Sequence, residues 1–273
     1  MLIMIIAAGG IFLFAHSRAA SRENRTSYAE LPAAATQDTP IAATSSPDTT
    51  RVPILVYHIV RPSYPNDSKE VRALAQTPET FDAQMKHLAD ADYRVISFRD
   101  LERHFSNGTP LPAKSVILSF DDGWSDQFAY AFPVLKKYGY SATFFVFTNA
   151  IGRRGFLTWE ELRAMLGAGM TVGSHSRSHP FLTKMAEPSA LWNEIYESRK
   201  MLEKNLGVSI DEFAYPFGQY NPEIVSLVKK AGYASARGDY YYGAMQSADR
   251  LYELSALNAP TTTELFARRF PKN

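Results

Sequence analysis

The sequence predicts an α/β fold: a closed or nearly closed β/α barrel with about seven parallel strands. Short, β-rich apolar runs alternate with helical patterns, and such alternation implies strands that are joined by crossovers and paired in parallel. The runs are continuously apolar, as expected of strands covered on both faces. The predicted strands span 52–58, 94–97, 115–120, 142–148, 170–174, 212–217 and 233–236.

Helix start signals lie between these runs. Thr and Pro at 77–78, and Asn and Pro at 221–222, place a capping residue before a proline at the first helical position. Thr158 and Glu161 have the spacing of a capping box. These signals predict that helices begin after each of the three positions.

The N-terminal region differs in composition from the rest. Residues 1–15 form an uncharged apolar run that is short for a membrane span and suits the core of a signal peptide. We therefore predict that residues 1–20 are a cleaved signal peptide or a retained membrane anchor. Residues 21–50 are rich in Ala, Ser, Thr and Pro, which predicts a disordered linker. The folded domain is predicted at 51–273.

Composition limits the function classes. The 273 residues are 45% hydrophobic, which is enough apolar material for one sizeable core. The net charge of +1 gives no indication of a nucleic-acid partner. The absence of cysteine excludes disulfides, thiolate metal ligands and a cysteine nucleophile.

Two short motifs carry the residues that point to chemistry. SFDDG contains Asp121 and Asp122, and SHSRSH contains His175 and His179, four positions apart. One carboxylate and two imidazoles can hold a divalent ion and leave positions open for water, while the second carboxylate is free to act as a general base. Either motif alone is also compatible with a solvated loop or a structural histidine pair.

The position of the motifs favours the metal site. Both follow directly on predicted strands, 115–120 and 170–174, and His58 ends the strand predicted at 52–58. In a β/α barrel the active site lies beyond the carboxyl ends of the strands. We therefore expect these side chains to converge on one face.

These motifs resemble those of the polysaccharide deacetylases of carbohydrate esterase family 4, the nodulation-type deacetylase domain. SFDDG corresponds to the first motif of that family and SHSRSH to the second, and FAYPFG at 213–218 occupies the place of the third. PILVYH, ATFFV and LTWEELRAM are also similar, so the resemblance covers roughly 52–236. FAYPFG and the YH after the first strand look most like the branch that acts on poly-N-acetylglucosamine.

The resemblance implies a distorted barrel and a metal-dependent removal of acetyl groups from sugars. It implies that Asp121 is the general base, and that Asp122, His175 and His179 are the metal ligands. It also implies that the backbone N–H of Phe217 faces the oxyanion of the tetrahedral intermediate.

The chain departs from the family pattern in the third motif and beyond. Ala214 stands where many members have an arginine that orients the base, and Phe217 stands where tyrosine is frequent. The branch acting on poly-N-acetylglucosamine also tends to lack this arginine. We expect Arg237, after the last predicted strand, to be a surface residue; the alternative is that it replaces the missing arginine.

A general acid must protonate the departing amine. Many members supply a late histidine for this step, but no histidine follows His179 in this chain. By elimination, His58 is the predicted acid. The alternatives for His58 are support of the site, a contact to substrate, and a strand-end histidine bonded to backbone.

Aromatic residues near the motifs are candidates for stacking on sugar rings. Phe217, Tyr215 and Trp124 are predicted to contact the substrate. For Tyr215 and Trp124, packing in the core is the alternative.

The apolar N-terminus predicts an exported, periplasmic or extracellular protein. The resemblance implies a metal-dependent hydrolase that removes N-acetyl groups from an N-acetylglucosamine polysaccharide. If residues 1–15 are retained, they anchor the protein in the inner membrane. The predicted metal is zinc, and the same ligand types accept nickel, cobalt or iron. The alternatives are an O-acetyl esterase or amidase, and a carbohydrate-binding protein that has lost catalysis.

Overall fold

The computed structural model describes residues 48–238 and 243–272, all within one compact unit that spans Thr44–Asn273. The predicted signal peptide or anchor, and nearly all of the predicted linker, lie outside the described residues. Among the residues that are described, no helix is both long and apolar enough to cross a membrane.

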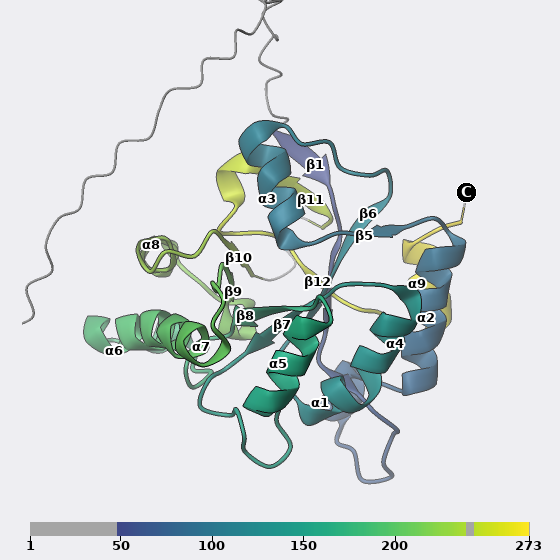
Figure 1. Cartoon of the computed structure of the whole chain (residues 1–273), viewed down its shortest axis with the longest axis horizontal. Helices are drawn as coiled ribbons and strands as arrows, with labels where there is room; N and C mark the ends of the chain where they lie inside the picture. The colour runs from purple at the N-terminus through teal and green to yellow at the C-terminus, as the bar shows by residue number, and fades with distance from the viewer. Residues whose placement is uncertain (1–47, 239–242, 273) are drawn as a thin grey trace, which may run out of the picture. The chain divides into compact units, whose positions relative to one another are not determined.

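A curled parallel sheet forms the centre of the domain and confirms the predicted fold class. Seven strands pair in the order β10-β9-β8-β7-β6-β2-β12, and β5 pairs with β6 in addition. Figure 1 shows the strands at the centre with helices around them. The strands are β2 (Ile54–Tyr57), β5 (Arg94–Val95), β6 (Ser115–Phe120), β7 (Thr143–Val146), β8 (Thr171–Ser174), β9 (Glu212–Ala214), β10 (Ser235–Arg237) and β12 (Leu257–Asn258).

All seven predicted strands are present, although most are shorter than predicted. The predicted strand 212–217 ends at Ala214, because Pro216–Gly218 form a 3₁₀ turn. β12 was not predicted, since it has only two residues; it pairs in parallel with β2. This strand closes one side of the sheet next to His58.

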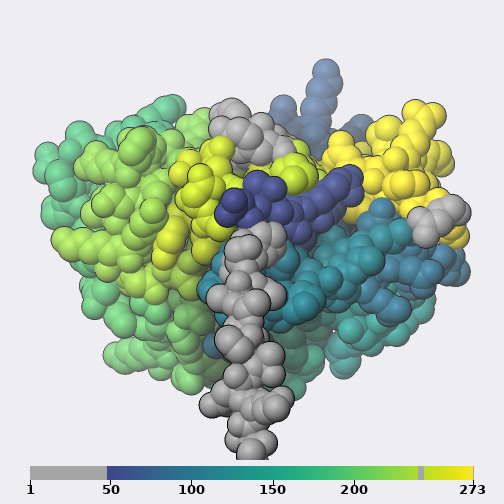
Figure 2. Space-filling view, turned by 90° about the horizontal axis from the view of Figure 1, so that it is seen from above, coloured from purple at the N-terminus to yellow at the C-terminus, as the bar shows by residue number. Residues whose placement is uncertain are grey.

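A short strand precedes the predicted start of the domain. β1 (Thr49–Arg51) pairs antiparallel with β11 (Met245–Ser247). Figure 2 shows purple N-terminal residues lying across the surface beside yellow-green residues from the later part of the chain. The paired structure therefore begins at Thr49, two residues before the predicted boundary at 51.

Nine α-helices occur in the described part of the chain, and the three predicted start signals are confirmed. Thr77 caps α2, Thr158 and Glu161 form a capping box on α5, and Asn221 caps α8. The helices are α1 (Lys69–Leu74), α2 (Pro78–Asp90), α3 (Phe98–Asn107), α4 (Phe132–Tyr138), α5 (Trp159–Gly167), α6 (Pro188–Trp192), α7 (Ser198–Leu206), α8 (Pro222–Lys230) and α9 (Thr263–Arg269).

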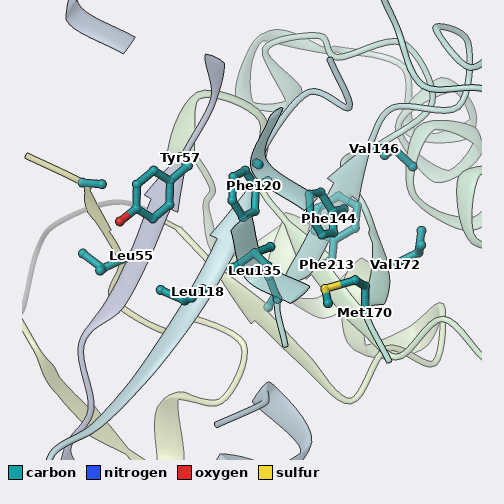
Figure 3. Close-up of a cluster of buried hydrophobic side chains, with 14 of the residues drawn as sticks. Leu55, Tyr57, Leu118, Phe120, Leu135, Phe144, Val146, Met170, Val172 and Phe213 are labelled. Carbon is teal, nitrogen blue, oxygen red and sulfur yellow. The ribbon is translucent and has the colours of Figure 1, made fainter. Parts of the chain in front are cut away.

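The sheet has a hydrophobic layer on each face. Alternate residues of a strand point to the same face. The larger cluster, on the outer face, contains every second strand residue, such as Leu118 and Phe120 on β6 (Figure 3). The residues of opposite parity, such as Ile117 and Phe145, join a smaller cluster with side chains of α3. The smaller cluster lies on the inner face. Ile117 shares its side of β6 with Ser119, and the next residue on that side is Asp121, at the mouth of the barrel.

Gly173 is required where β8 passes β7. A Cβ at this position would lie 2.5 Å from Cδ1 of Phe145 and 3.1 Å from the carbonyl oxygen of Glu212. The ring of Phe145 therefore fills the space that a side chain at 173 would occupy. This packing matters for the site described below, because the guanidinium of Arg237 lies 4.7 Å above the Phe145 ring.

We predict that Gly173→Ala lowers the free energy of unfolding by about 1–3 kcal/mol, the usual cost of overpacking a core. Urea unfolding of the purified protein measures the change. Gly167→Ala is the matched control, because a Cβ there meets nothing within 4 Å and alanine at the end of α5 favours the helix. Equal stability of the two variants would contradict this account of Gly173.

Candidate metal centre and active site

The two carboxylates of SFDDG face different partners. Asp121 still belongs to the strand pattern, since its N–H donates to the Tyr57 carbonyl (2.9 Å). Asp122 and Gly123 both have left-handed backbones, with φ of 71° and 72°. Two left-handed residues reverse the chain at once, so the side chains of the adjacent aspartates separate.

The loop after β8 brings two histidines together. Ser176 and His179 are left-handed, with φ of 67° and 59°. The Ser176 hydroxyl accepts a hydrogen bond from the His179 N–H (3.0 Å). The Glu194 carboxylate accepts from the backbone N–H groups of Arg177 (3.0 Å) and Ser178 (2.7 Å). These bonds turn the loop back so that His179 faces His175.

Asp122, His175 and His179 form a set of converging ligand atoms. Nε2 of His175 and Nε2 of His179 are 3.2 Å apart. Oδ1 of Asp122 lies 3.4 Å from Nε2 of His179 and 3.8 Å from Nε2 of His175. Metal–ligand bonds of 2.0–2.1 Å in a tetrahedron give ligand–ligand distances of about 3.3–3.4 Å. The three side chains therefore converge with the spacing of one face of a tetrahedral site.

The surroundings leave one ring nitrogen of each histidine facing the ligand set. Nδ1 of His175 lies 2.7 Å from the Ala214 carbonyl oxygen and donates to it, which leaves Nε2 free to bind an ion. Burial, followed by the nearby His175, lowers the pKa of His179 to about 4. His179 is thus neutral near pH 7, the form that binds metal.

Asp121 has a separate environment. The residue is 5% exposed, and Nη2 of Arg237 donates to its Oδ1. The second oxygen, Oδ2, is 3.9 Å from Nε2 of His58 and 3.9 Å from Nε2 of His175. Burial alone would raise the pKa of Asp121, but the charge of the adjacent Arg237 guanidinium holds it below its usual range. The group is a carboxylate at neutral pH, with one oxygen facing the ligand set.

Arg237 corrects one prediction. It is 3% exposed and its guanidinium lies on the Phe145 ring, so it is a buried partner of Asp121 and not a surface residue. Its position has a simple origin in the sheet register: Arg237 on β10 is the direct partner of Ala214 on β9. The small side chain at 214 leaves room, and the neighbouring strand supplies the arginine that the third motif lacks.

His58 follows β2 and reaches the same face. Its carbonyl and that of Asp121 both accept from Nε2 of Gln127, at 2.8 and 2.6 Å. The fully buried Gln127 thereby ties the end of β2 to the end of β6. Gln127 was not predicted, because a glutamine that donates only to backbone carbonyls belongs to no recognisable sequence motif.

Two of the predicted substrate residues have other roles. Tyr215 is 1% exposed and donates its hydroxyl hydrogen bond to the Tyr252 carbonyl (2.9 Å), so the core alternative is correct for this side chain. Nε1 of Trp124 donates to Oδ2 of Asp122 (3.0 Å), and the indole stacks on Phe156. Trp124 therefore orients the Asp122 carboxylate, and it does not line the cavity described next.

A cavity of about 300 Å³ joins these groups, and we call it the metal pocket. Phe217 and Leu74 contribute apolar surface to its wall, and Asn258 of β12 adds an amide. Its other polar groups are those of His58, Asp121, Asp122, His175, His179 and Arg237.

Backbone strain is concentrated at this site. Six non-glycine residues among those described have positive φ, and four of them belong to the motifs: Asp122, Ser176, His179 and Phe217. Such conformations persist where the surrounding structure enforces them, and they cluster at functional sites.

The match to known proteins covers the part of the chain that builds this site. Residues 108–236 match the family model described as polysaccharide deacetylase. That segment contains both motifs and strands β6 to β9. The chain contains a polysaccharide deacetylase domain.

Individual relatives agree with this assignment. YxkH of Bacillus subtilis (strain 168) is 30% identical over 183 residues, which are 67% of this chain and 62% of that protein. The poly-beta-1,6-N-acetyl-D-glucosamine N-deacetylase of Staphylococcus aureus (strain MRSA252) is 28% identical over 180 residues, covering 61% of this chain and 62% of the relative. The match thus spans less than two thirds of these relatives.

Solved structures support the fold. The Streptococcus pyogenes deacetylase PplD, in complex with acetate, superposes with a TM-score of 0.71 at 29% identity, covering 77% of this chain and 92% of that chain. BC0361, a polysaccharide deacetylase from Bacillus cereus, gives a TM-score of 0.70 at 27% identity, covering 81% and 69%.

We predict that Trp124→Phe weakens the binding of zinc, used as a probe ion, by about 10–100-fold, the usual cost of removing a group that orients a ligand. Phenylalanine preserves the stacking on Phe156 but cannot donate to Asp122. Isothermal titration of the metal-free protein with zinc measures the effect. Trp192→Phe is the matched control, because Trp192 stacks on Tyr196 on α6 and η3 (Asn193–Glu197), away from the metal pocket. Equal affinities for the two variants would refute this role for Trp124.

Proposed function

We propose that this protein is a metal-dependent hydrolase that removes N-acetyl groups from an N-acetylglucosamine-containing polysaccharide. One observation carries the proposal: a complete set of three ligand side chains lies beside a second carboxylate that is charged, buried and held by its own arginine. This arrangement separates the binding of an ion from the transfer of a proton. The family and the names of the S. aureus relatives support the type of substrate.

The ion is proposed to be zinc, held by Asp122, His175 and His179. Two nitrogen donors and one carboxylate suit zinc, and they also accept nickel, cobalt or iron. When bound, such an ion polarises the acetyl carbonyl and lowers the pKa of a water molecule beside it.

Asp121 is proposed to act as the general base. Its Oδ2 faces the ligand set, whereas its Oδ1 is occupied by Arg237. Only one oxygen is therefore positioned to take a proton from water. Because the pKa of Asp121 is held low, the basic form is present at neutral pH.

His58 is proposed to donate the proton to the departing amine. It lines the metal pocket, and its Nε2 lies 3.9 Å from the same Oδ2 of Asp121. Base and acid thus share one side of the cavity, so a proton taken by Asp121 has a short path to His58. Phe217, whose left-handed backbone is at the pocket wall, is proposed to offer its N–H to the oxyanion.

The natural polymer lies outside the cell if the protein is exported. Export is proposed from the apolar run at 1–15, with a retained anchor as one of the two outcomes. The placement is periplasmic or extracellular.

The proposed activity is tested by acetate release from β-linked N-acetylglucosamine oligomers. Release should stop when the protein is stripped of metal and return when zinc is added. Asp121→Asn should reduce turnover by at least about 10²-fold while zinc still binds, since the base contributes 10²–10⁴-fold. Asp82→Asn, which alters only a surface ion pair with Lys137, is the control. Release from O-acetyl esters but not from N-acetyl sugars would favour the esterase alternative.

A second prediction concerns the pH profile. Arg237 lowers the pKa of Asp121, so Arg237→Gln should raise that pKa and move the acidic limb of the kcat/KM profile to higher pH. The base form is lost as pH falls, so the variant should lose activity at a higher pH than the wild type does. Profiles from pH 4 to 8 test this, and an unshifted acidic limb would contradict the pairing. Arg199→Gln, on α7, is the control.

A further inference from the structure

The metal pocket is small relative to a polymer. Its volume of about 300 Å³ is at the lower end of the range for small-molecule sites. A polysaccharide that places one acetylated sugar in the pocket must therefore lay its neighbouring units on the rim. The composition of the rim then affects how well a long substrate binds.

One side of the rim carries an exposed pair of aromatic rings. Phe217 lies 4.5 Å from the ring of His179, and it stacks on Phe181 at 3.8 Å with an interplanar angle of 7°. The two phenylalanines are 44% and 36% exposed, among the most exposed large apolar side chains that the structure describes. They come from the loops after β9 and β8, which are also joined by a hydrogen bond from Thr183 Oγ1 to Gln219 Oε1 (3.4 Å).

The outer face of Phe181 carries a lysine side chain. Phe217 covers one face of Phe181, and Nζ of Lys184 lies 4.3 Å from the centroid of the Phe181 ring. Lys184 is itself exposed, and a lysine side chain can move aside at small cost when a ligand arrives. Phe181 is thus covered by an aromatic ring on one face and by an exposed, displaceable lysine on the other.

We propose that Phe181, backed by Phe217, is a second sugar subsite that binds the unit next to the one being deacetylated. The inference rests on the proposed function. The C–H groups on the apolar face of a pyranose ring are attracted to the negative face of an aromatic ring. Lys184, displaced from the ring, can donate hydrogen bonds to a hydroxyl or acetamido oxygen of the same unit. The subsite therefore takes a neutral, N-acetylated pyranose.

A structural role alone explains the pair less well. Packing between loops favours burial, whereas each of these residues is more than a third exposed. Isolated exposed apolar residues are common, but here two are stacked in parallel beside a metal ligand. The subsite hypothesis accounts for both the exposure and the location.

The test compares oligomer lengths in a protein that binds but does not turn over. Zinc-loaded, full-length Asp121→Asn is titrated with N-acetylglucosamine and with its β-linked tetramer, with and without Phe181→Leu. We expect Phe181→Leu to weaken tetramer binding about 3–10-fold, the value of one aromatic stacking contact, and to leave monomer and zinc binding unchanged. Phe181→Tyr should restore tetramer binding.

Tyr130→Leu is the matched control, since Tyr130 is 37% exposed and does not line the metal pocket. Unchanged tetramer binding in Phe181→Leu would overturn the subsite, and so would an equal loss for monomer and tetramer. If wild-type protein releases acetate but Phe181→Leu binds normally, only the subsite fails. If no oligomer binds or is deacetylated, both proposals fail.

Discussion

The site depends on one local constraint, the left-handed reversal at Asp122 and Gly123 that separates two adjacent carboxylates. In a continuous strand the two side chains would point to opposite faces, one inward and one towards the outer core. The reversal returns Asp122 to the mouth of the barrel, where Trp124 and the two histidines meet it. A glycine is needed to complete this turn, because a Cβ at 123 would lie 2.8 Å from Cγ1 of Val146. One short motif thus supplies two carboxylates with different neighbours. Asp121 pairs with the Arg237 cation, and Asp122 faces the two histidines.

The barrel supports the other carboxylate through a chain of packed residues. Gly173 makes space for Phe145, Phe145 supports the guanidinium of Arg237, and Arg237 bonds to Asp121. Each link depends on strand parity, since positions 121, 145, 173 and 237 lie on the inner face of neighbouring strands. Burying a carboxylate without a partner costs free energy of folding. Arg237 therefore both stabilises the fold and keeps Asp121 in its charged form. Stability and proposed function are coupled at this residue.

The sequence predicted the elements and the convergence of Asp122, His175 and His179 well, because those features are local. Apolar runs and capping residues mark the strands and helices, and SFDDG and SHSRSH each lie beside the strand that positions them. Arg237 was misjudged because its partner is 116 positions away and only the register of β9 with β10 brings the two together. Tyr215 was misassigned for a related reason: it lies near a motif, but its side chain points away from the pocket. Gln127 and β12 have no sequence signature, and only the folded structure reveals them. α3, by contrast, begins with a capping box of Ser97 and Asp100 that a closer reading of the sequence could find.

The central claim is that Asp122 binds the ion and Asp121 does not. A crystal structure of the zinc-loaded protein, with anomalous diffraction measured at the zinc edge, tests it most directly. The account predicts one ion bonded to Asp122 Oδ1 and to Nε2 of both His175 and His179, with Asp121 still paired to Arg237 and not bonded to the ion. An ion bonded to Asp121, or an Asp121 released from Arg237, would contradict the separation of roles on which the proposed mechanism rests.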